Sequence, residues 1–187
     1  MNIRLLGTVA ACATLFFTSA NAAISVIGPG PAQICYQAAE AGASPSDYMT
    51  YCNQALAGTL SSDDRAATLI NRGVLKLSVN DFEAAAGDFK SGLAINDNLG
   101  EGYVDLGAVL IARKQYADAI LNINRGLKIG MKKPHLAYFD RAMADEALGN
   151  LQAAYDDYRQ ALQIAPDFSK ASDELKRFKI VDKADGA

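Results

Sequence analysis

Apolar side chains recur every three or four residues through most of the chain, which is the spacing of one face of an α-helix. From residue 66 onward these helical runs come in pairs, and a short polar turn separates the two members of each pair. The three turns are at Asn80-Asp81, Lys114-Gln115 and Gly149-Asn150. Alanine is abundant, and alanine is the strongest helix former and a poor strand former. The pattern therefore predicts an all-α chain.

The paired helices repeat with a period of 34 or 35 residues. Four sets of equivalent positions keep this spacing: Phe82, Tyr116 and Leu151; Ala85, Ala119 and Ala154; Leu93, Leu127 and Leu162; Ile95, Ile129 and Ile164. One inserted residue near Gly130–Pro134 accounts for the spacing of 35. A single pair of helices cannot bury its apolar face alone, so the units are expected to stack.

A helix–turn–helix unit of 34 residues resembles the tetratricopeptide repeat. The third unit carries the most motif residues of that family: Tyr138, Ala142, Gly149, Ala154, Tyr158, Ala161 and Pro166. The resemblance covers residues 66–168 and implies a right-handed α-solenoid with repeats at 66–99, 100–134 and 135–168. It also implies a protein-binding scaffold, because arrays of this family bind other proteins.

Two features indicate how the helices of one repeat pack. Small residues recur on the first helix at Gly73, Gly107 and Ala142, which predicts a close approach to the second helix. Oppositely charged residues also recur at matching places of the two helices in the first and third repeats: Arg72 with Asp88, and Arg141 with Asp157. The middle repeat has Leu106 and Asn122 there instead. We therefore predict one arginine–aspartate pair inside each of the outer repeats.

The first 22 residues have the features of a secretory signal peptide: Arg4, an apolar run from Leu5 to Thr18, and small residues before a cleavage site between Ala22 and Ala23. The run is too short to span a membrane. Export to the periplasm of a bacterial cell is the expected location, with secretion or lipid anchoring as alternatives. Lipid anchoring would use Cys12, but the apolar run continues past that residue.

The segments that flank the repeats are expected to cap them. Residues 23–32 contain two Gly-Pro steps and are expected to form a flexible lead-in, followed by a capping helical hairpin over 33–58. Cleavage after Ala22 leaves two cysteines, Cys35 and Cys52, and an even number in an exported chain predicts a disulfide. Two reduced, buried thiols are the alternative. Residues 169–182 are expected to form a C-terminal capping helix.

Charge and composition exclude several classes of function. The formal net charge is −3 and the isoelectric point is near 5.1, which disfavours a nucleic-acid binder. The sequence has no glycine-rich phosphate loop, no paired-histidine metal motif and no nucleophile elbow. His135, the one histidine, is expected to be a surface or packing residue. We therefore expect no enzyme activity, no cofactor and no metal.

The resemblance places the first helix of each repeat on the concave side of the solenoid. The residues expected to form this partner-binding face are Ile70, Asn71, Val74, Leu77, Glu101, Val104, Asp105, Ala108, Ile111, Leu136, Phe139, Asp140, Met143 and Glu146. Some tetratricopeptide domains hold an acidic chaperone tail there with Lys, Arg and Asn, whereas the charged residues here are acids. Alternatively, most of the apolar members pack against neighbouring repeats.

The face is expected to prefer an apolar or basic segment, such as an amphipathic helix, with Phe139 and Met143 as anchors. The leading hypothesis is a non-catalytic protein-interaction scaffold in the bacterial cell envelope. The alternative is a self-associating structural protein, whose concave face is filled by another copy or by its own N-terminal segment.

Overall fold

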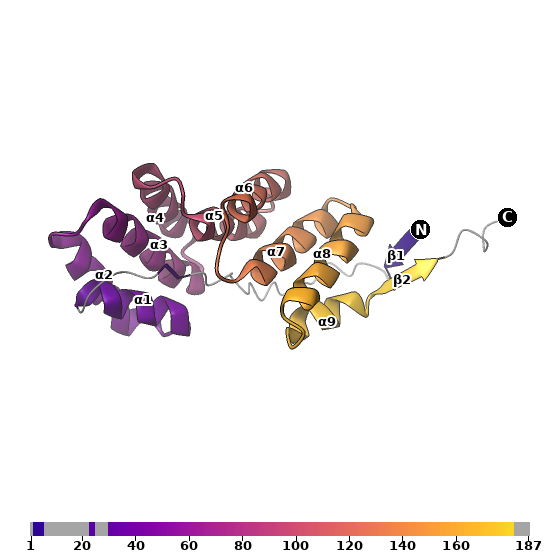
Figure 1. The fold of residues 1–187 in the computed structure, drawn as a ribbon, viewed down its shortest axis with the longest axis horizontal. Helices are drawn as coiled ribbons and strands as arrows, with labels where there is room; N and C mark the ends of the chain where they lie inside the picture. Colours follow the sequence, from indigo (N-terminus) through magenta and orange to yellow (C-terminus); the bar gives the residue numbers. More distant parts are fainter. Residues whose placement is uncertain (1, 6–22, 25–29, 182–187) are drawn as a thin grey trace.

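The computed structural model describes residues 2–5, 23–24 and 30–181. These residues form a row of helical hairpins with a short two-stranded sheet at the far end (Figure 1). The helices are α1 Pro31–Ala41, α2 Pro45–Ala57, α3 Ser62–Ser78, α4 Phe82–Ile95, α5 Gly100–Ala112, α6 Tyr116–Ile129, α7 Pro134–Ala147, α8 Leu151–Ile164 and α9 Ser169–Leu175. The strands are β1 Asn2–Leu5 and β2 Phe178–Val181.

The hairpins stack as the repeat pattern predicts. Each odd-numbered helix from α1 to α7 packs against the helix that follows it, and each hairpin contacts the next. The first helices also touch across repeats, because α5 contacts both α3 and α7. The helices α3, α5 and α7 therefore share one side of the α-solenoid, which we call the inner face.

The turn inside each repeat has the same backbone structure. The N–H of Asp81 donates to the carbonyl of Lys76 at 3.0 Å, and the N–H groups of Gln115 and Asn150 make the corresponding bonds at 2.8 Å. Such 6→1 bonds satisfy carbonyls that the end of the first helix leaves open, and they require one left-handed residue. That residue is Asn80, Lys114 or Gly149, with φ of 62°, 60° and 82°.

The close approach of paired helices is confirmed. A Cβ atom on Gly73 would lie 2.5 Å from Cε1 of Phe89, and one on Gly107 would lie 2.6 Å from Cγ1 of Ile123. Both distances are shorter than real contacts allow, so only glycine fits at this helix separation. Ala142 occupies the equivalent position of the third repeat and is fully buried.

The N-terminal capping hairpin is closed by a disulfide. Cys35 of α1 and Cys52 of α2 are bonded, with their Cα atoms 4.9 Å apart, and both are fully buried. The helix α1 begins at Pro31, two residues before the sequence pattern suggests, because proline suits the first turn of a helix. The helix α3 begins four residues before residue 66, where the side chain of Ser61 accepts the N–H of Asp64 at 3.0 Å.

The C-terminal cap differs from the expected helix over 169–182. The helix α9 ends at Leu175, and Phe178–Val181 forms β2, which pairs antiparallel with β1 so that Phe178 faces Leu5. The ring of Phe178 is buried against Tyr155 and Tyr158, with centroids 5.8 and 5.9 Å away. This packing turns the backbone out of the helix and onto α8. The strand β1 lies in the expected signal peptide.

Candidate partner-binding face

The predicted arginine–aspartate pairs are present in the first and third repeats. Arg72 donates from Nε and Nη2 to the two carboxylate oxygens of Asp88, at 2.8 and 2.7 Å. Arg141 makes the same two bonds to Asp157, at 2.7 and 2.8 Å. The aspartates are buried and the arginines half-buried, so these paired groups hold the two helices of each repeat in register.

The same arginines also bind the preceding hairpin, which the sequence analysis missed. Nη1 of Arg72 donates to Asn53 on α2 at 2.7 Å, and Nη1 of Arg141 donates to Asn124 on α6. Each arginine therefore links three helices. Neighbouring hairpins are therefore joined by these hydrogen bonds as well as by apolar packing.

None of the residues predicted for the partner-binding face is exposed. Glu101, Leu136, Met143 and Glu146 are half-buried, and the remaining members are buried. Phe139 is a packing residue, because its ring lies 5.5 Å from that of Tyr158 and 5.2 Å from that of Phe168. Its predicted role as an adaptable anchor is therefore not supported, and the same role for half-buried Met143 stays a prediction.

Three polar residues occupy the same position on successive inner helices. Asn71 of α3, Asp105 of α5 and Asp140 of α7 are spaced by 34 and 35 residues, and we call them the inner polar row. Asn71 and Asp105 are fully buried, and Asp140 is 2% exposed. Buried amide and carboxylate groups are costly unless they are hydrogen-bonded, so what each one binds is informative.

Asn71 binds the backbone of the N-terminal segment. Its Nδ2 donates to the carbonyl of Ile24 at 2.7 Å, and the N–H of Ile24 donates to its Oδ1 at 2.7 Å. Ala23, the predicted first residue after cleavage, is buried beside this contact, whereas Ala22 lies outside the described residues. The predicted flexible lead-in is thus anchored at Ile24. The sequence did carry a signal for this contact, because Asn71 is an amide at the position where the other two repeats have an aspartate.

Asp140 has unused hydrogen-bonding capacity. Its Oδ2 is buried and has no hydrogen-bond partner in the part of the chain that the structure describes. Burial raises the pKa of this carboxyl well above its ordinary value of 3.8, and the positive charge of Lys170 opposes that shift only in part. A donor group brought by a partner would relieve the cost of this buried carboxyl.

The half-buried acids at the border of the face already have donors. Glu146 accepts from the hydroxyl of Tyr158 at 3.3 Å and from Arg177. Burial, together with the charge of Glu146, raises the pKa of Tyr158, so this hydroxyl stays protonated. Glu101 accepts the backbone N–H of Lys132 at 3.1 Å. The two border acids are therefore held in place, but they still contribute negative charge.

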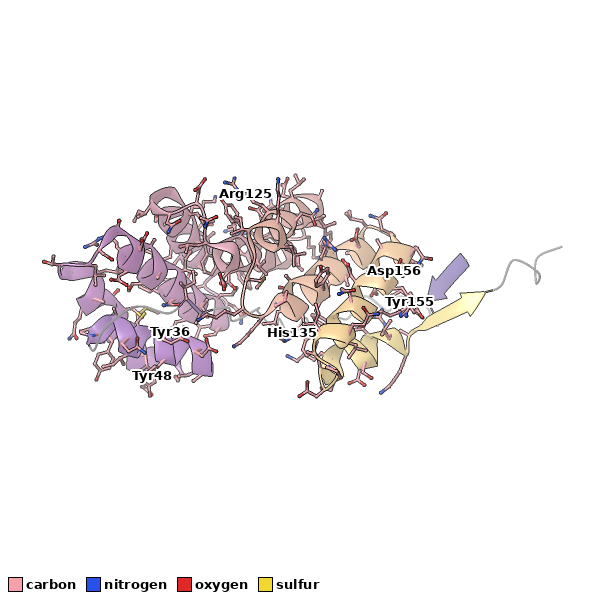
Figure 2. The ribbon with its side chains drawn as sticks, in the orientation of Figure 1. Tyr36, Tyr48, Arg125, His135, Tyr155 and Asp156 are labelled. Carbon is pink, nitrogen blue, oxygen red and sulfur yellow. A yellow bond between two sulfur atoms is a disulfide. The ribbon has the colours of Figure 1, made fainter. Side chains whose placement is uncertain are left out.

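His135 is a packing residue, in agreement with the sequence analysis. It lies at the start of α7 (Figure 2), and its ring meets that of Phe168 nearly edge-on at 5.3 Å. Burial and the nearby positive charge of Lys133 lower its pKa. Among the described residues, no group of three or more His, Cys, Asp or Glu side chains could hold a metal ion. No helix in the same ranges is long and apolar enough to cross a membrane.

The comparisons with known proteins agree with this geometry. Residues 135–168 match the family model of the tetratricopeptide repeat. The chain has the fold of tetratricopeptide-repeat proteins. No curated protein matches the chain.

Several solved tetratricopeptide-type structures superpose on most of the solenoid. The Arabidopsis OM64 tetratricopeptide domain has a TM-score of 0.59 and 20% identity, and the match covers 63% of this chain and 96% of that domain. The first such domain of Spaghetti (RPAP3), bound to the HSP90 peptide SRMEEVD, has a TM-score of 0.57 and 21% identity, covering 61% and 92%. MamA has a TM-score of 0.61 and 16% identity, covering 80% and 82%.

Proposed function

We propose that this chain is an exported, non-catalytic scaffold that captures a segment of a partner protein on the α5 and α7 part of its inner face. The observation that carries the proposal is the buried Oδ2 of Asp140, which has no hydrogen-bond partner among the described residues and lies on an inner helix of a fold whose Spaghetti example was solved with a bound peptide. The preferred segment is apolar with basic or N–H donor groups. Such a segment buries apolar area and supplies the donor that Asp140 lacks.

Charge supports this choice of partner. The Spaghetti domain was solved with a peptide that ends in Glu-Glu-Val-Asp, which is acidic. The inner face here carries Asp105 and Asp140, with Glu101 and Glu146 at its border. Like charges across an interface are unfavourable, so an acidic tail is a poor ligand for this chain.

Export to the periplasm of a bacterial cell is also part of the proposal. The signal-peptide pattern of residues 1–22 supports it, as does the disulfide between Cys35 and Cys52, since disulfides persist in oxidising compartments. Mass spectrometry of the exported protein tests the location. The expected product begins at Ala23, and a cytoplasmic chain that retains Met1 would contradict export.

Two labelled peptides test the binding site. One is amphipathic and basic, the other ends in an acidic tail, and each is titrated into the mature chain and into the variant D140N. We expect the basic peptide to bind more tightly and to lose about tenfold in affinity with D140N, since a hydrogen bond to a charged group contributes about 1.5–3 kcal/mol.

D156N is the matched control for this titration. Asp156 lies on α8 (Figure 2), which is not one of the inner helices, and it is exposed and accepts a hydrogen bond from Gln152 at 2.8 Å. This variant should leave the affinity unchanged. Tighter binding of the acidic tail, or equal losses with both variants, would reject the inner face as the binding site.

Self-association is the competing function, and mass photometry of the mature chain separates the two. The exposed large apolar residues of the described chain are scattered along it, from Tyr51 and Val79 to Leu121 and Leu148. Single exposed apolar residues are normal on monomers. We therefore expect a monomer, and a tight homodimer would favour the structural protein.

A further inference from the structure

The connection between the second and third repeats, residues 130–133, is fixed onto the start of α5. A Cβ atom on Gly100 would overlap the carbonyl oxygen of Gly130, so only glycine lets the two backbones approach this closely. Glu101 adds a hydrogen bond, because its carboxylate accepts the N–H of Lys132 at 3.1 Å. The path of the connection is therefore set by α5, and this path determines what its two lysines reach.

The two lysines reach the capping hairpin, although two whole repeats separate them from it in the chain. Nζ of Lys133 lies 2.8 Å from Oε1 of Glu40, near the end of α1. Nζ of Lys132 lies 5.7 Å from the centroid of the Tyr36 ring, which is within the range of a cation–π attraction (Tyr36 is labelled in Figure 2). We call these four residues the α1 latch.

The lysines of the latch are specific to this connection. At the equivalent places the connection before α5 has Asn98 and Leu99, and the one before α9 has Asp167 and Phe168. Residues that only support a repeat recur with its period. A basic pair that occurs in one connection, where that connection meets a distant hairpin, therefore indicates a role specific to this place.

The helices that the latch joins enclose the N-terminal segment. Ala23 is 2% exposed, and its apolar cluster takes further buried residues from α1, α3 and α5. Tyr36 of the latch packs against this cluster, and so does Ile129, the last residue of α6 before the connection. Asn71 of α3 holds Ile24 by two bonds of 2.7 Å, and Figure 1 shows this segment beside α3.

The latch is weak enough to open while the helices stay folded. The side chains of Lys133 and Glu40 are 36% and 37% exposed. Ion pairs with this exposure contribute little to stability, and salt screens them. We infer that the α1 latch is a salt-sensitive closure of the solenoid, which holds α1 against the connection and controls release of Ala23 and Ile24 from the inner face of α3.

This closure restricts where a partner protein can bind. The α3 part of the inner face is filled by Ala23 and Ile24 while the latch is closed, which leaves α5 and α7 for the partner proposed above. Opening of the latch frees the α3 part as well. The inference does not depend on capture of a partner, because failure of the peptide titration would leave the exchange experiment below unaffected.

Charge reversal tests the latch, with exchange of the Ile24 amide followed by NMR in the chain prepared to begin at Ala23. E40K and K133E each bring like charges together, so the segment should be released more often and Ile24 should exchange at least about fivefold faster. The double variant E40K/K133E restores an attractive pair with the opposite polarity. Its exchange rate should return to within about twofold of the natural chain.

D173K is the matched control for charge reversal. Asp173 forms an exposed ion pair with Lys176 at 2.7 Å on α9, away from α1 and α3, and its reversal should leave Ile24 unchanged. N71A is the control for the probe itself. It removes both bonds to Ile24 and should accelerate exchange by at least about tenfold.

Salt gives a second measurement that needs no charge reversal. Between about 0.02 and about 0.5 M NaCl, exchange of Ile24 in the natural chain should become at least about threefold faster relative to the amides of α8, because salt screens the exposed pair. In E40Q the pair is absent from the start. The same change of salt should therefore have little effect on Ile24 in that variant.

Several results would overturn the inference. Unchanged exchange of Ile24 in both E40K and K133E would show that the segment leaves by a route that the latch does not control. Failure of the double variant to recover would show that the single variants act on something other than this pair. An equal salt effect in E40Q and in the natural chain, or no effect of N71A, would reject the latch as well.

Discussion

The first and third repeats share their scaffold but differ on the inner face. Both carry a two-bond arginine–aspartate pair between their helices, and both arginines reach an asparagine of the preceding hairpin. At the equivalent inner position, however, Asn71 is satisfied by Ile24, whereas Oδ2 of Asp140 finds no hydrogen-bond partner among the residues described. The scaffold is repeated, and the inner position is specific to each repeat.

This difference indicates where function is located. Residues that hold helices together must satisfy the same geometry in each unit, so they recur with the period of the repeat. A buried carboxyl without a donor destabilises the unit that contains it, and such a cost is typical of binding sites. We therefore propose that the third repeat carries the binding position, whereas the first repeat carries the anchored residue Ile24.

Loss of the disulfide should have the largest effect and should act mainly on the first repeat. The bond closes a loop between Cys35 and Cys52, and a loop of this length contributes about 3 kcal/mol in the chain-entropy model. In the variant with both cysteines changed to alanine, the free energy of unfolding in urea should fall by about that much. Amide hydrogen exchange should accelerate more in α3 than in α7, relative to the natural chain. Labelling of both thiols in the unreduced exported protein would contradict the bond.

Replacement of the arginine should lower the free energy of unfolding more in the third repeat than in the first. Asp88 also forms an ion pair with Lys76 at 2.7 Å. Among the described residues, Asp157 forms an ion pair with Arg141 alone. We therefore expect R141M to cost about 3 kcal/mol and R72M about half as much, because an unpaired buried carboxylate is the main penalty. Both values come from urea unfolding at neutral pH, and equal losses would show that Lys76 does not compensate.

Substitutions of Asp140 and Asn71 in the inner polar row should change the stability of the chain in opposite directions. D140N removes a carboxyl whose pKa is raised by burial, so it should stabilise the chain by about 1 kcal/mol at pH 7.5. The gain should shrink towards pH 4, because both folded and unfolded states are then increasingly protonated. N71D should destabilise instead, since it loses the donor to Ile24.

Urea unfolding of D140N and N71D at pH 4 and pH 7.5 measures these two changes. D156N again serves as the control on an exposed acid and should change stability little at either pH. A pH-independent gain in D140N would show that Asp140 is already ionised or already paired in solution.

The turn residues should give the smallest effects. Gly149 has a left-handed φ of 82°, so G149A should cost about 1 kcal/mol. Asn80 at the same place tolerates this conformation, and N80G should gain only about 0.5 kcal/mol. K114G in the middle repeat should gain about 1 kcal/mol, because lysine tolerates the left-handed region less well. Thermal unfolding measures all three, and a loss of stability in K114G would mean that the Lys114 side chain has another role.

The sequence predicted the features that depend on position within one repeat. The 34-residue period places Arg72 opposite Asp88 and Arg141 opposite Asp157, because helix geometry alone determines which faces meet inside a hairpin. The close contact of Gly73 with Phe89 follows for the same reason. The bonds to Asn53 and Asn124 were missed, since they depend on the rotation between neighbouring hairpins, which no spacing reports.

The C-terminal cap shows another limit of pattern reasoning. Ala171, Leu175 and Phe178 have helical spacing, yet the helix ends at Leu175 and Phe178 begins a strand. The aromatic rings of Tyr155 and Tyr158 determine where Phe178 packs. Tertiary contacts commonly override short helical patterns near the ends of a chain, where few backbone hydrogen bonds favour either structure.

The sequence by itself determined the stacked helical pairs, the pairing of two cysteines and the acidic character of the inner face. Each of these follows from local periodicity or from composition. Only the tertiary structure decided that Ile24 binds Asn71 and that Asp140 is buried with no described residue donating to its Oδ2. Both depend on contacts between segments far apart in the chain, and the energy of a polar group depends on what surrounds it after folding.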